Sequence, residues 1–305
     1  MKLRVHIFIL SLLAVFPVYG QQIALTFDDA PMGDGAKLTG AQRGRMLIAK
    51  LAKMEVEEAA FFAVSRFEPG SEGEARLKAY VKAGHKIGNH SHSHRRPAQL
   101  GAEAYLADVR KADSVFRSWL GFFPYYRYPY LDEGKTIGMR DSLRAGIAEM
   151  GYANGYVTVD NYDWYINALY TKAIRAGKTV DMRKLRAFYV DHLFRSITFY
   201  DSLAQATLGR SPKHVLLLHE NDLAAFFIDV LIIKLQDHGW EIISPSEAYS
   251  DPIANMIPDV LFNGQGRIAA LARAKGVSRQ DLVQPIEDET YLDKEASRRG
   301  IFHNP

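Results

Sequence analysis

Residues 23–31 read IALTFDDAP, an apolar run that ends in two adjacent aspartates. The run from Ile23 to Phe27 has the length and composition of a short buried strand. Asp28 and Asp29 stand at its end, where neighbouring side chains point to opposite sides of a strand. Adjacent carboxylates repel each other, and a nearby cation removes that repulsion. The stretch therefore predicts a strand with a candidate site at its carboxyl end.

The segments that follow alternate between strand-like and helical patterns. Short apolar or extended stretches occur at residues 59–64, 85–89, 122–130, 156–159, 214–218 and 240–244. Helical periodicity occurs at residues 42–54, 72–83, 102–120, 137–150 and 223–236. About seven strand–helix units favour an α/β protein with a parallel sheet, open or closed into a barrel. A long helical insertion at residues 165–209 interrupts this order, and the chain after Pro252 reads as a polar tail with one helix at 266–276.

The first 20 residues have the pattern of a secretory signal peptide. Lys2 and Arg4 give a basic start, and residues 5–18 are almost all apolar. This run is shorter than the roughly 20 residues that cross a membrane. Because Val-Tyr-Gly before Gln21 is an imperfect cleavage pattern, an uncleaved amino-terminal anchor is the alternative. We expect an exported protein, periplasmic or secreted, of a bacterial envelope.

Composition excludes several classes of site and partner. The chain has 38 Lys and Arg against 35 Asp and Glu. Loss of residues 1–20 leaves 36 basic against 35 acidic residues, or +1. That balance gives no reason to expect a nucleic-acid partner. After residue 20 the sequence has no second apolar stretch of that length, so we expect no stable membrane span once the signal is removed. The absence of cysteine excludes disulfides, thiolate metal sites and a cysteine nucleophile.

Ionisable or polar side chains follow nearly every predicted strand. In a parallel βα architecture, catalytic groups collect at the carboxyl ends of the strands. Beyond the aspartate pair, these positions hold His90, His92 and His94 in NHSHSH, Arg127 in RYPY, Asp160, Asp163 and Trp164 in DNYDW, and His219 and Glu220 after HVLLL. The helices between them carry ordinary mixed charges. This segregation predicts an active site at one end of the sheet.

His90 and His94 are four residues apart, a spacing typical of metal ligands. Two histidines and one carboxylate form a three-ligand catalytic zinc site, with the fourth position open for water. A metal there lowers the pKa of that water towards about 7. Zinc is the expected ion, and cobalt, nickel or manganese also suit these ligands. The alternative is a solvent-exposed histidine loop without metal.

The remaining ionisable residues suit acid–base chemistry. One aspartate of the pair can bind the metal while the other accepts a proton from water; the alternative is a loop pair that caps a helix. Arg127 can hold an aspartate ionised, or form a salt bridge at the rim. His219 with an aspartate partner can act as a general acid, or be a hydrogen-bonded core residue.

Five blocks resemble the motifs of one known family. TFDDAP resembles the TFDDGP signature of the polysaccharide deacetylases, the NodB-like carbohydrate esterase family 4. In the same order, HSHSH fits H-[ST]-x-x-H, RYPY fits R-x-P-Y, DNYDW fits D-x-x-D-W and LLLH fits L-x-L-H. The blocks span residues 25–219, and the similarity with its flanks covers about residues 21–250.

The resemblance implies a fold and an activity. The fold is a distorted seven-stranded (β/α) barrel over residues 21–252, with a helical insertion at 165–209 and a C-terminal extension at 253–305. The activity is metal-dependent removal of acetyl groups from N-acetylated, or sometimes O-acetylated, sugars of a glycan. Peptidoglycan, chitin-type oligomers, an exopolysaccharide and acetylated xylan all remain open as substrates.

Matched motif positions imply a role for each of ten residues. The base is Asp28, oriented by Arg127, and the metal ligands are Asp29, His90 and His94. The general acid is His219, tuned by Asp163, and the backbone N–H of Tyr130 helps to stabilise the oxyanion. Trp164 and Leu217 form the wall against the acetate methyl group. His92 occupies a variable position and is not expected to be a ligand.

Two departures from the family pattern and two rival functions stay open. Ala30 replaces the glycine of the first motif, and its methyl group could shift the loop. The long insertion either shapes the substrate groove or is a structural helical pair packed on the barrel. The rivals are an amidase that acts on a non-sugar carbon–nitrogen bond and an inactive glycan-binding module.

Overall fold

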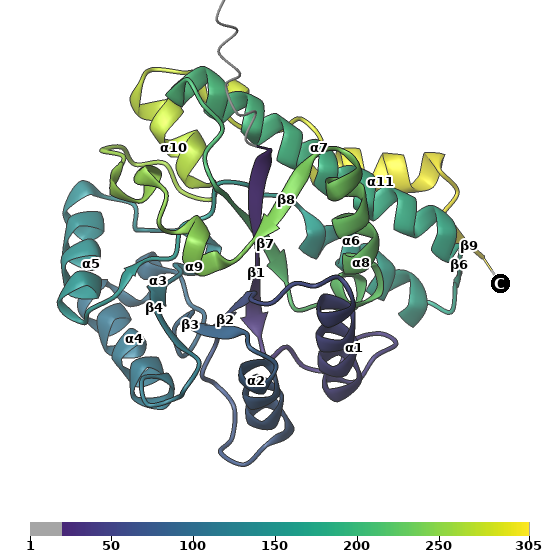
Figure 1. Cartoon of the computed structure of the whole chain (residues 1–305), viewed down its shortest axis with the longest axis horizontal. Helices are drawn as coiled ribbons and strands as arrows, with labels where there is room; N and C mark the ends of the chain where they lie inside the picture. The colour runs from purple at the N-terminus through teal and green to yellow at the C-terminus, as the bar shows by residue number, and fades with distance from the viewer. Residues whose placement is uncertain (1–19, 305) are drawn as a thin grey trace, which may run out of the picture.

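The computed structural model describes residues 20–304, and its centre is one strand. This strand, β1 (Gln21–Ala30), pairs in parallel with three others. The sheet order is β5-β4-β3-β2-β1-β7, with β8 also on β1. Figure 1 labels these strands apart from β5. The partners are β2 (Ala60–Ala63), β3 (Lys86–Asn89), β4 (Phe122–Tyr126), β5 (Ala153–Asn154), β7 (His214–His219) and β8 (Trp240–Ile243).

The sheet curls into a distorted barrel, which confirms the predicted fold class. β7 pairs along residues 23–28 of β1, so β2 and β8 share the opposite edge. β8 takes residues 21–24 of that edge, and β2 takes residues 26–30. Beyond β5, Val159 forms an isolated parallel bridge with Leu216 of β7. The chain from 153 to 159 therefore connects the β4 side of the sheet back to β7.

Helices surround the sheet (Figure 1). The main ones between strands are α1 (Gly40–Lys53), α2 (Glu72–Lys82), α4 (Ala102–Phe116), α5 (Ile137–Glu149) and α8 (Asp222–Asp237), and the short ones are α3 (Pro97–Leu100) and α9 (Pro245–Ala248). Each of the five long helices lies within a few residues of its predicted range. α1 shows why: Thr39 and Gln42 form a capping box, and Leu47 and Leu51 recur at helical spacing on the buried face.

The insertion consists of α6 (Asp163–Arg175), β6 (Thr179–Val180) and α7 (Met182–Leu208). Asp181 caps the start of α7, accepting hydrogen bonds from the backbone N–H of Arg183 and Lys184. α7 packs against α8 and α10, and its tyrosines Tyr189 and Tyr200 are buried in the main core. Part of the insertion is therefore structural.

The C-terminal extension is more than the polar tail that the sequence predicted. It contains η2 (Pro252–Asn255), α10 (Arg267–Ala274), η3 (Arg279–Asp281), α11 (Glu289–Arg298) and β9 (Phe302–His303), and β9 pairs with β6. Its widely spaced apolar residues Leu282, Leu292 and Ile301 are fully buried in the main core. The prediction of a polar tail was wrong because these apolar residues are too widely spaced to form a separate core. They pack into the main core together with residues of the insertion.

Three other predictions need correction or lie outside the described chain. The predicted strand at 156–159 is only the bridge at Val159, and β5 stands earlier. The extended stretch 122–130 ends at Tyr126 and is followed by the short turn η1 (Pro129–Leu131). The predicted signal peptide, apart from Gly20, lies outside the described residues. Among residues 20–304, no helix is both long and apolar enough to cross a membrane.

Candidate active site

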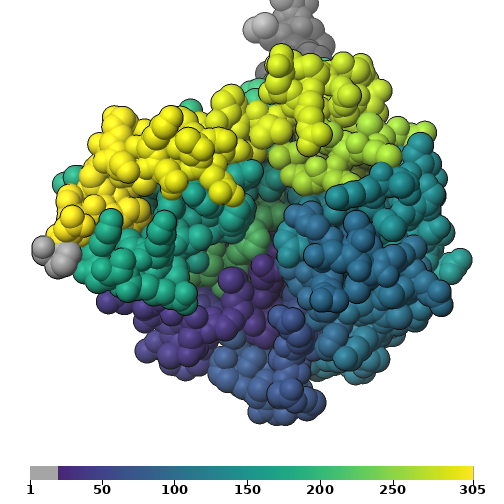
Figure 2. Space-filling view, turned by 180° about the vertical axis from the view of Figure 1, so that it is seen from behind, coloured from purple at the N-terminus to yellow at the C-terminus, as the bar shows by residue number. Residues whose placement is uncertain are grey.

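The carboxyl ends of the barrel strands surround a cavity of about 600 Å³. Figure 2 shows a hollow near the middle of one face, where purple, blue and green segments meet. The cavity is lined by eight of the ten residues with a predicted role: Asp28, Asp29, His90, His94, Tyr130, Trp164, Leu217 and His219. The other two, Arg127 and Asp163, are fully buried and contact lining residues. The predicted constellation is thus assembled at the predicted end of the sheet.

Asp29, His90 and His94 converge as a three-residue group suited to a metal ion. One Asp29 oxygen lies 2.9 Å from His94 Nε2 and 3.5 Å from His90 Nε2. Tetrahedral zinc, with bonds of about 2.0–2.2 Å, needs ligand atoms roughly 3.3–3.5 Å apart. That same buried Asp29 oxygen makes no hydrogen bond of good geometry to any described residue. The donor set and this unsatisfied oxygen both fit a divalent cation.

The residues of this group are held by neighbouring groups. The carbonyl oxygen of Arg127 lies 2.8 Å from His90 Nδ1, and a carbonyl only accepts, so that nitrogen carries a proton and Nε2 faces the site. Burial alone would raise the pKa of Asp29, but the close approach of the His90 and His94 rings outweighs burial and holds it well below its usual value. His92 turns away, with its Nδ1 2.9 Å from the Ser65 hydroxyl. It is not part of the group, as predicted.

Backbone strain is concentrated around this cavity. Six non-glycine residues of the described chain have positive φ, and five lie in or next to the site: Asp29 (66°), Ser91 (71°), His94 (56°), Tyr130 (59°) and Leu131 (48°). Left-handed backbone costs non-glycine residues on the order of 1–3 kcal/mol each. Such strain persists only where the surrounding structure imposes it, and it is typical of functional sites. Sequence patterns gave no sign of it.

The predicted base is fixed by a buried arginine. Arg127 Nη1 donates to one Asp28 oxygen at 2.7 Å, and both side chains are almost fully buried. The same guanidinium donates to the hydroxyls of Thr26 at 3.1 Å and Tyr249 at 3.0 Å, and its Cζ lies 4.0 Å from the centroid of the Phe62 ring. The other Asp28 oxygen is 3.8 Å from His90 Nε2. Asp28 therefore faces the ligand group with a fixed orientation, and the rim salt bridge is excluded for Arg127.

The predicted acid is paired with its predicted partner. Asp163 Oδ1 lies 2.6 Å from His219 Nδ1, while Asp163 Oδ2 accepts the His219 backbone N–H at 3.0 Å. Burial alone would lower the pKa of His219, but the charge and hydrogen bond of Asp163 are stronger and raise it to about 10. The side chain of His219 stays 17% exposed. The ring is therefore protonated at neutral pH and can reach a ligand in the cavity.

Helix α7 of the insertion lies close to the His219–Asp163 pair on the side away from the cavity. Burial first, and then the charge of nearby Asp163, raise the pKa of Tyr189 well above its usual value. His192 Nε2, also on α7, accepts the backbone N–H of Tyr162 at 3.1 Å. Helix α7 thus supports the segment that carries Asp163, a role that sequence patterns did not predict.

The predicted substrate contacts lie on the rim. Tyr130 and Trp164 are exposed, and Leu217 is buried in the wall. The backbone N–H of Tyr130 donates to no acceptor within the described residues, so it is available to an oxyanion. Ala30 fits without difficulty, because it is fully buried in the core and its φ is not positive. The departure at Ala30 therefore leaves the site intact.

Two acidic residues near the site have clearer roles than the sequence suggested. Asp160 lines the cavity beside His219, and burial raises its pKa to about 7. Glu220 follows His219 and is completely buried. Its carboxylate accepts from Arg76 at 3.1 Å, from the Tyr80 hydroxyl at 2.6 Å and from the Met32 backbone at 2.7 Å. Glu220 therefore ties the end of β7 to the loop that follows Asp29.

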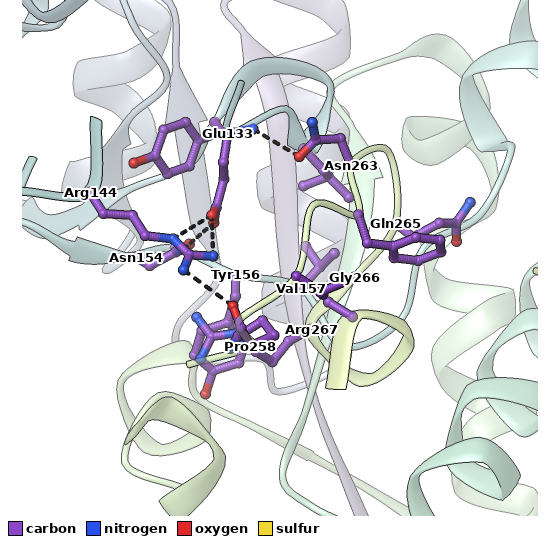
Figure 3. A pocket seen from close by; sticks show the side chains of 16 residues that line it. Glu133, Arg144, Asn154, Tyr156, Val157, Pro258, Asn263, Gln265, Gly266 and Arg267 are labelled. Carbon is purple, nitrogen blue, oxygen red and sulfur yellow. Dashed lines mark hydrogen bonds and ion pairs between the residues drawn. The ribbon is translucent and has the colours of Figure 1, made fainter. Parts of the chain in front are cut away.

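A second, smaller cavity of about 50 Å³ contains none of the predicted site residues. It lies where the extension meets the turn after β4, as the close-up shows (Figure 3). There Arg144 donates to Glu133 at 2.6 Å, and Asn154 donates to the other Glu133 oxygen at 2.9 Å. Leu131 lines both cavities. Asn263 of the extension accepts the backbone N–H of Glu133 at 3.2 Å, so the extension holds the outer side of the turn that carries Tyr130.

Comparison with known proteins gives a family and a fold. A sequence model described as Polysaccharide deacetylase matches residues 17–154. The chain is similar to a carbohydrate esterase family 4 pseudoenzyme from Bacillus anthracis, with 17% identity and a TM-score of 0.53, covering 75% of this chain and 65% of that one. A mutant of that pseudoenzyme, described as having restored activity, matches with 18% identity, a TM-score of 0.53 and coverages of 75% and 67%.

A peptidoglycan N-acetylglucosamine deacetylase is also similar, with 20% identity and a TM-score of 0.51, covering 75% of this chain and 89% of that one. At such identities these likenesses establish the fold alone. No curated protein sequence matches the chain. The matched sequence model agrees with the five ordered motifs and the assembled residues: residues 17–154 match the polysaccharide deacetylase family, the NodB-like carbohydrate esterase family 4.

Proposed function

We propose that this protein is a metal-dependent hydrolase that removes acetyl groups from N-acetylated sugars of a polysaccharide or oligosaccharide. Hydrolysis of sugar O-acetyl groups by the same site is part of this proposal. The observation that supports it best is the pairing of two acid–base residues around one ligand group. Asp28, at the end of β1, is fixed by Arg127, and His219, at the end of the neighbouring strand β7, is fixed by Asp163. Glycan binding alone requires neither a base nor an acid.

The metal site would be formed by Asp29, His90 and His94. A divalent cation held there, with zinc the expected ion and cobalt, nickel or manganese as alternatives, would polarise the acetyl carbonyl and lower the pKa of a water molecule.

Asp28 would take the proton of the attacking water, since Arg127 keeps its carboxylate turned toward the ligands. The Tyr130 N–H would donate a hydrogen bond to the oxyanion that forms on the carbonyl.

His219 would complete the reaction as the general acid. Its pKa of about 10 keeps the ring protonated, so it can donate a proton to the sugar nitrogen as the carbon–nitrogen bond breaks. Asp163 stabilises the imidazolium and fixes the ring through Nδ1, which leaves Nε2 for the substrate. Trp164 and Leu217, which line the same cavity, would enclose the acetyl methyl group.

The test is acetate release from a panel of acetylated glycans. The panel holds N-acetylglucosamine oligomers, peptidoglycan and acetylxylan, each with the zinc-loaded protein, with chelator and with Asp28→Asn. Chelator-sensitive release that Asp28→Asn lacks would support the proposal and identify the substrate class. No release from any glycan by a protein with bound metal would overturn it. Activity on small acyclic amides alone would favour the amidase, and glycan binding without metal would favour the binding module.

We also propose that residues 1–20 direct export and are removed, leaving residues 21–252 as the catalytic domain. The charged start and the apolar run of the sequence support this. Amino-terminal sequencing of the exported protein tests it. A first residue of Gln21 would agree with the proposal, whereas a membrane-bound chain that starts at Met1 would favour the uncleaved anchor.

A further inference from the structure

The candidate catalytic cavity continues into another hollow, which runs along helix α6. The hollow along α6 has a volume of about 790 Å³. Four residues line both hollows: Met32, Trp164, Asn167 and Asn221. The two hollows therefore form one groove, which passes the exposed indole of Trp164. We call it the α6 groove, and it extends well beyond the space that one acetylated sugar needs.

One face of α6 forms a wall of this groove. Trp164, Ala168, Lys172 and Arg175 follow at intervals of three or four residues, which places them on one side of the helix. At 1.5 Å per residue, Lys172 lies roughly 12 Å along the helix from Trp164. The groove therefore runs from the catalytic residues at one end to Lys172 and Arg175 at the other.

The opposite wall is the loop after Asp29, which is held rigidly. Arg43 Nη2 donates to the carbonyl oxygens of Met32 at 2.6 Å and Gly33 at 2.7 Å. Arg43 Nη1 pairs with the buried Asp222 at 3.2 Å. Gly35 is required here, because a Cβ atom would come within 2.0 Å of an Asp222 oxygen. The groove is therefore part of the folded structure and has a fixed wall.

The charges along the groove are unevenly paired. Arg43 is buried and neutralised by Asp222, so it offers no free charge. Lys172 and Arg175 are exposed, and no carboxylate of residues 20–304 lies within 4 Å of either. The one further acid of the lining, Asp34, accepts the backbone N–H of Gly40 at 2.8 Å. The end of the groove remote from the catalytic residues is therefore net positive.

We propose that the α6 groove binds an anionic glycan, so that Lys172 and Arg175 contact an acidic substituent on a sugar beyond the one that loses its acetyl group. The substituent is a carboxylate or a phosphate, both of which bind paired cations. This inference rests on the proposed deacetylase function and specifies its substrate. It also gives α6 of the insertion a second role, since the helix then forms part of the substrate site.

The experiment compares acetylated oligosaccharides of equal length that are neutral, carboxylated or phosphorylated. The variants are wild type, the double variant Lys172→Gln/Arg175→Gln and the control Lys178→Gln. Lys178 is an exposed cation just beyond the end of α6 and does not line the groove. The double variant should reduce the kcat/KM ratio of anionic to neutral substrate about tenfold, through KM. Lys178→Gln should leave that ratio unchanged, and high salt should reduce it in wild type.

A binding measurement separates this inference from the proposed function. Calorimetry with Asp28→Asn records binding of the same oligosaccharides without turnover. Tighter binding of an anionic ligand, lost in the triple variant that adds Lys172→Gln/Arg175→Gln, would support the groove even if no acetate is released. The carboxylated and phosphorylated ligands then identify the preferred anion. Equal affinity for neutral and anionic ligands would overturn the inference. So would a difference in affinity between them that the Lys172→Gln/Arg175→Gln substitutions leave unchanged.

Discussion

Asp28 and His219 are register partners on the neighbouring parallel strands β1 and β7. Both side chains line the same cavity, and each has a buried partner of opposite charge behind it. The pairing places a proton acceptor and a proton donor on the two sides of one ligand group. The four predictions below test separate parts of this arrangement.

Asp28→Asn should reduce turnover severely while metal binding survives. General acid–base catalysis contributes about 10²–10⁴-fold, so a loss of kcat in this range is expected. Asp29→Ala should lose both activity and metal, because Asp29 is the shared carboxylate of the ligand group. Acetate release and the metal content by mass spectrometry check both variants. Near-normal turnover of Asp28→Asn with saturating metal would contradict the assignment.

Asp163→Asn should move the alkaline limb of the pH–rate profile to lower pH. In the proposed mechanism the protonated form of His219 is the donor, and its pKa of about 10 would keep activity until pH approaches that value. Without the charge of Asp163, the pKa should fall toward the ordinary histidine value of about 6.5, so roughly 30-fold fewer rings are protonated at pH 8. The measurement is kcat/KM between pH 6 and about 10.5.

A second histidine–aspartate pair on β7 supplies the control for this profile. His214 Nε2 lies 3.1 Å from Asp201 Oδ1 at the opposite end of the strand, remote from the cavity. Asp201→Asn should lower stability but leave the shape of the profile unchanged. An unshifted alkaline limb in Asp163→Asn would show that His219 is not the acid.

Arg127→Lys should reduce kcat about 10- to 100-fold with little change in metal affinity. The Arg127 side chain orients Asp28, whereas the Arg127 backbone carbonyl orients His90. Lysine retains the carbonyl and the charge but not the planar set of donors that reaches Asp28, Thr26 and Tyr249 together. Metal titration and steady-state kinetics separate the two effects. An equal loss of metal affinity and kcat would contradict this division of roles.

Glu220→Gln should destabilise the fold by about 3 kcal/mol, because it removes the buried negative charge that Arg76 contacts at 3.1 Å. Glu72→Gln is the matched control, since Glu72 also pairs with Arg76, at 3.2 Å, but its side chain is 49% exposed. Its loss should cost under about 1 kcal/mol. Urea unfolding measures both variants. Equal costs for the two would show that the Glu220 network does not hold the loop after Asp29.

The order of strands and helices, and the candidate site residues that the structure brings together, could be proposed from the sequence and its motifs. Local periodicity, caps and turn residues act over a few positions, so they are readable without tertiary structure. The histidine spacing and the aspartate pair at a strand end likewise predicted a metal site with His90 and His94, and the family resemblance identified Asp29 as its third residue. Local patterns failed at β5 and in the extension, where the apolar residues are buried by distant elements.

Tertiary structure alone decided which of these residues act together. Arg127 meets Asp28 across 99 positions of sequence, and Asp163 meets His219 across 56. Nothing in the local pattern of either residue states its partner, because such contacts depend on how the barrel closes. The same holds for the left-handed backbone at Asp29, which the packed loop imposes, and for the α6 groove. The sequence determined the chemical groups, and the closed barrel determined their distances, their pKa values and the space between them.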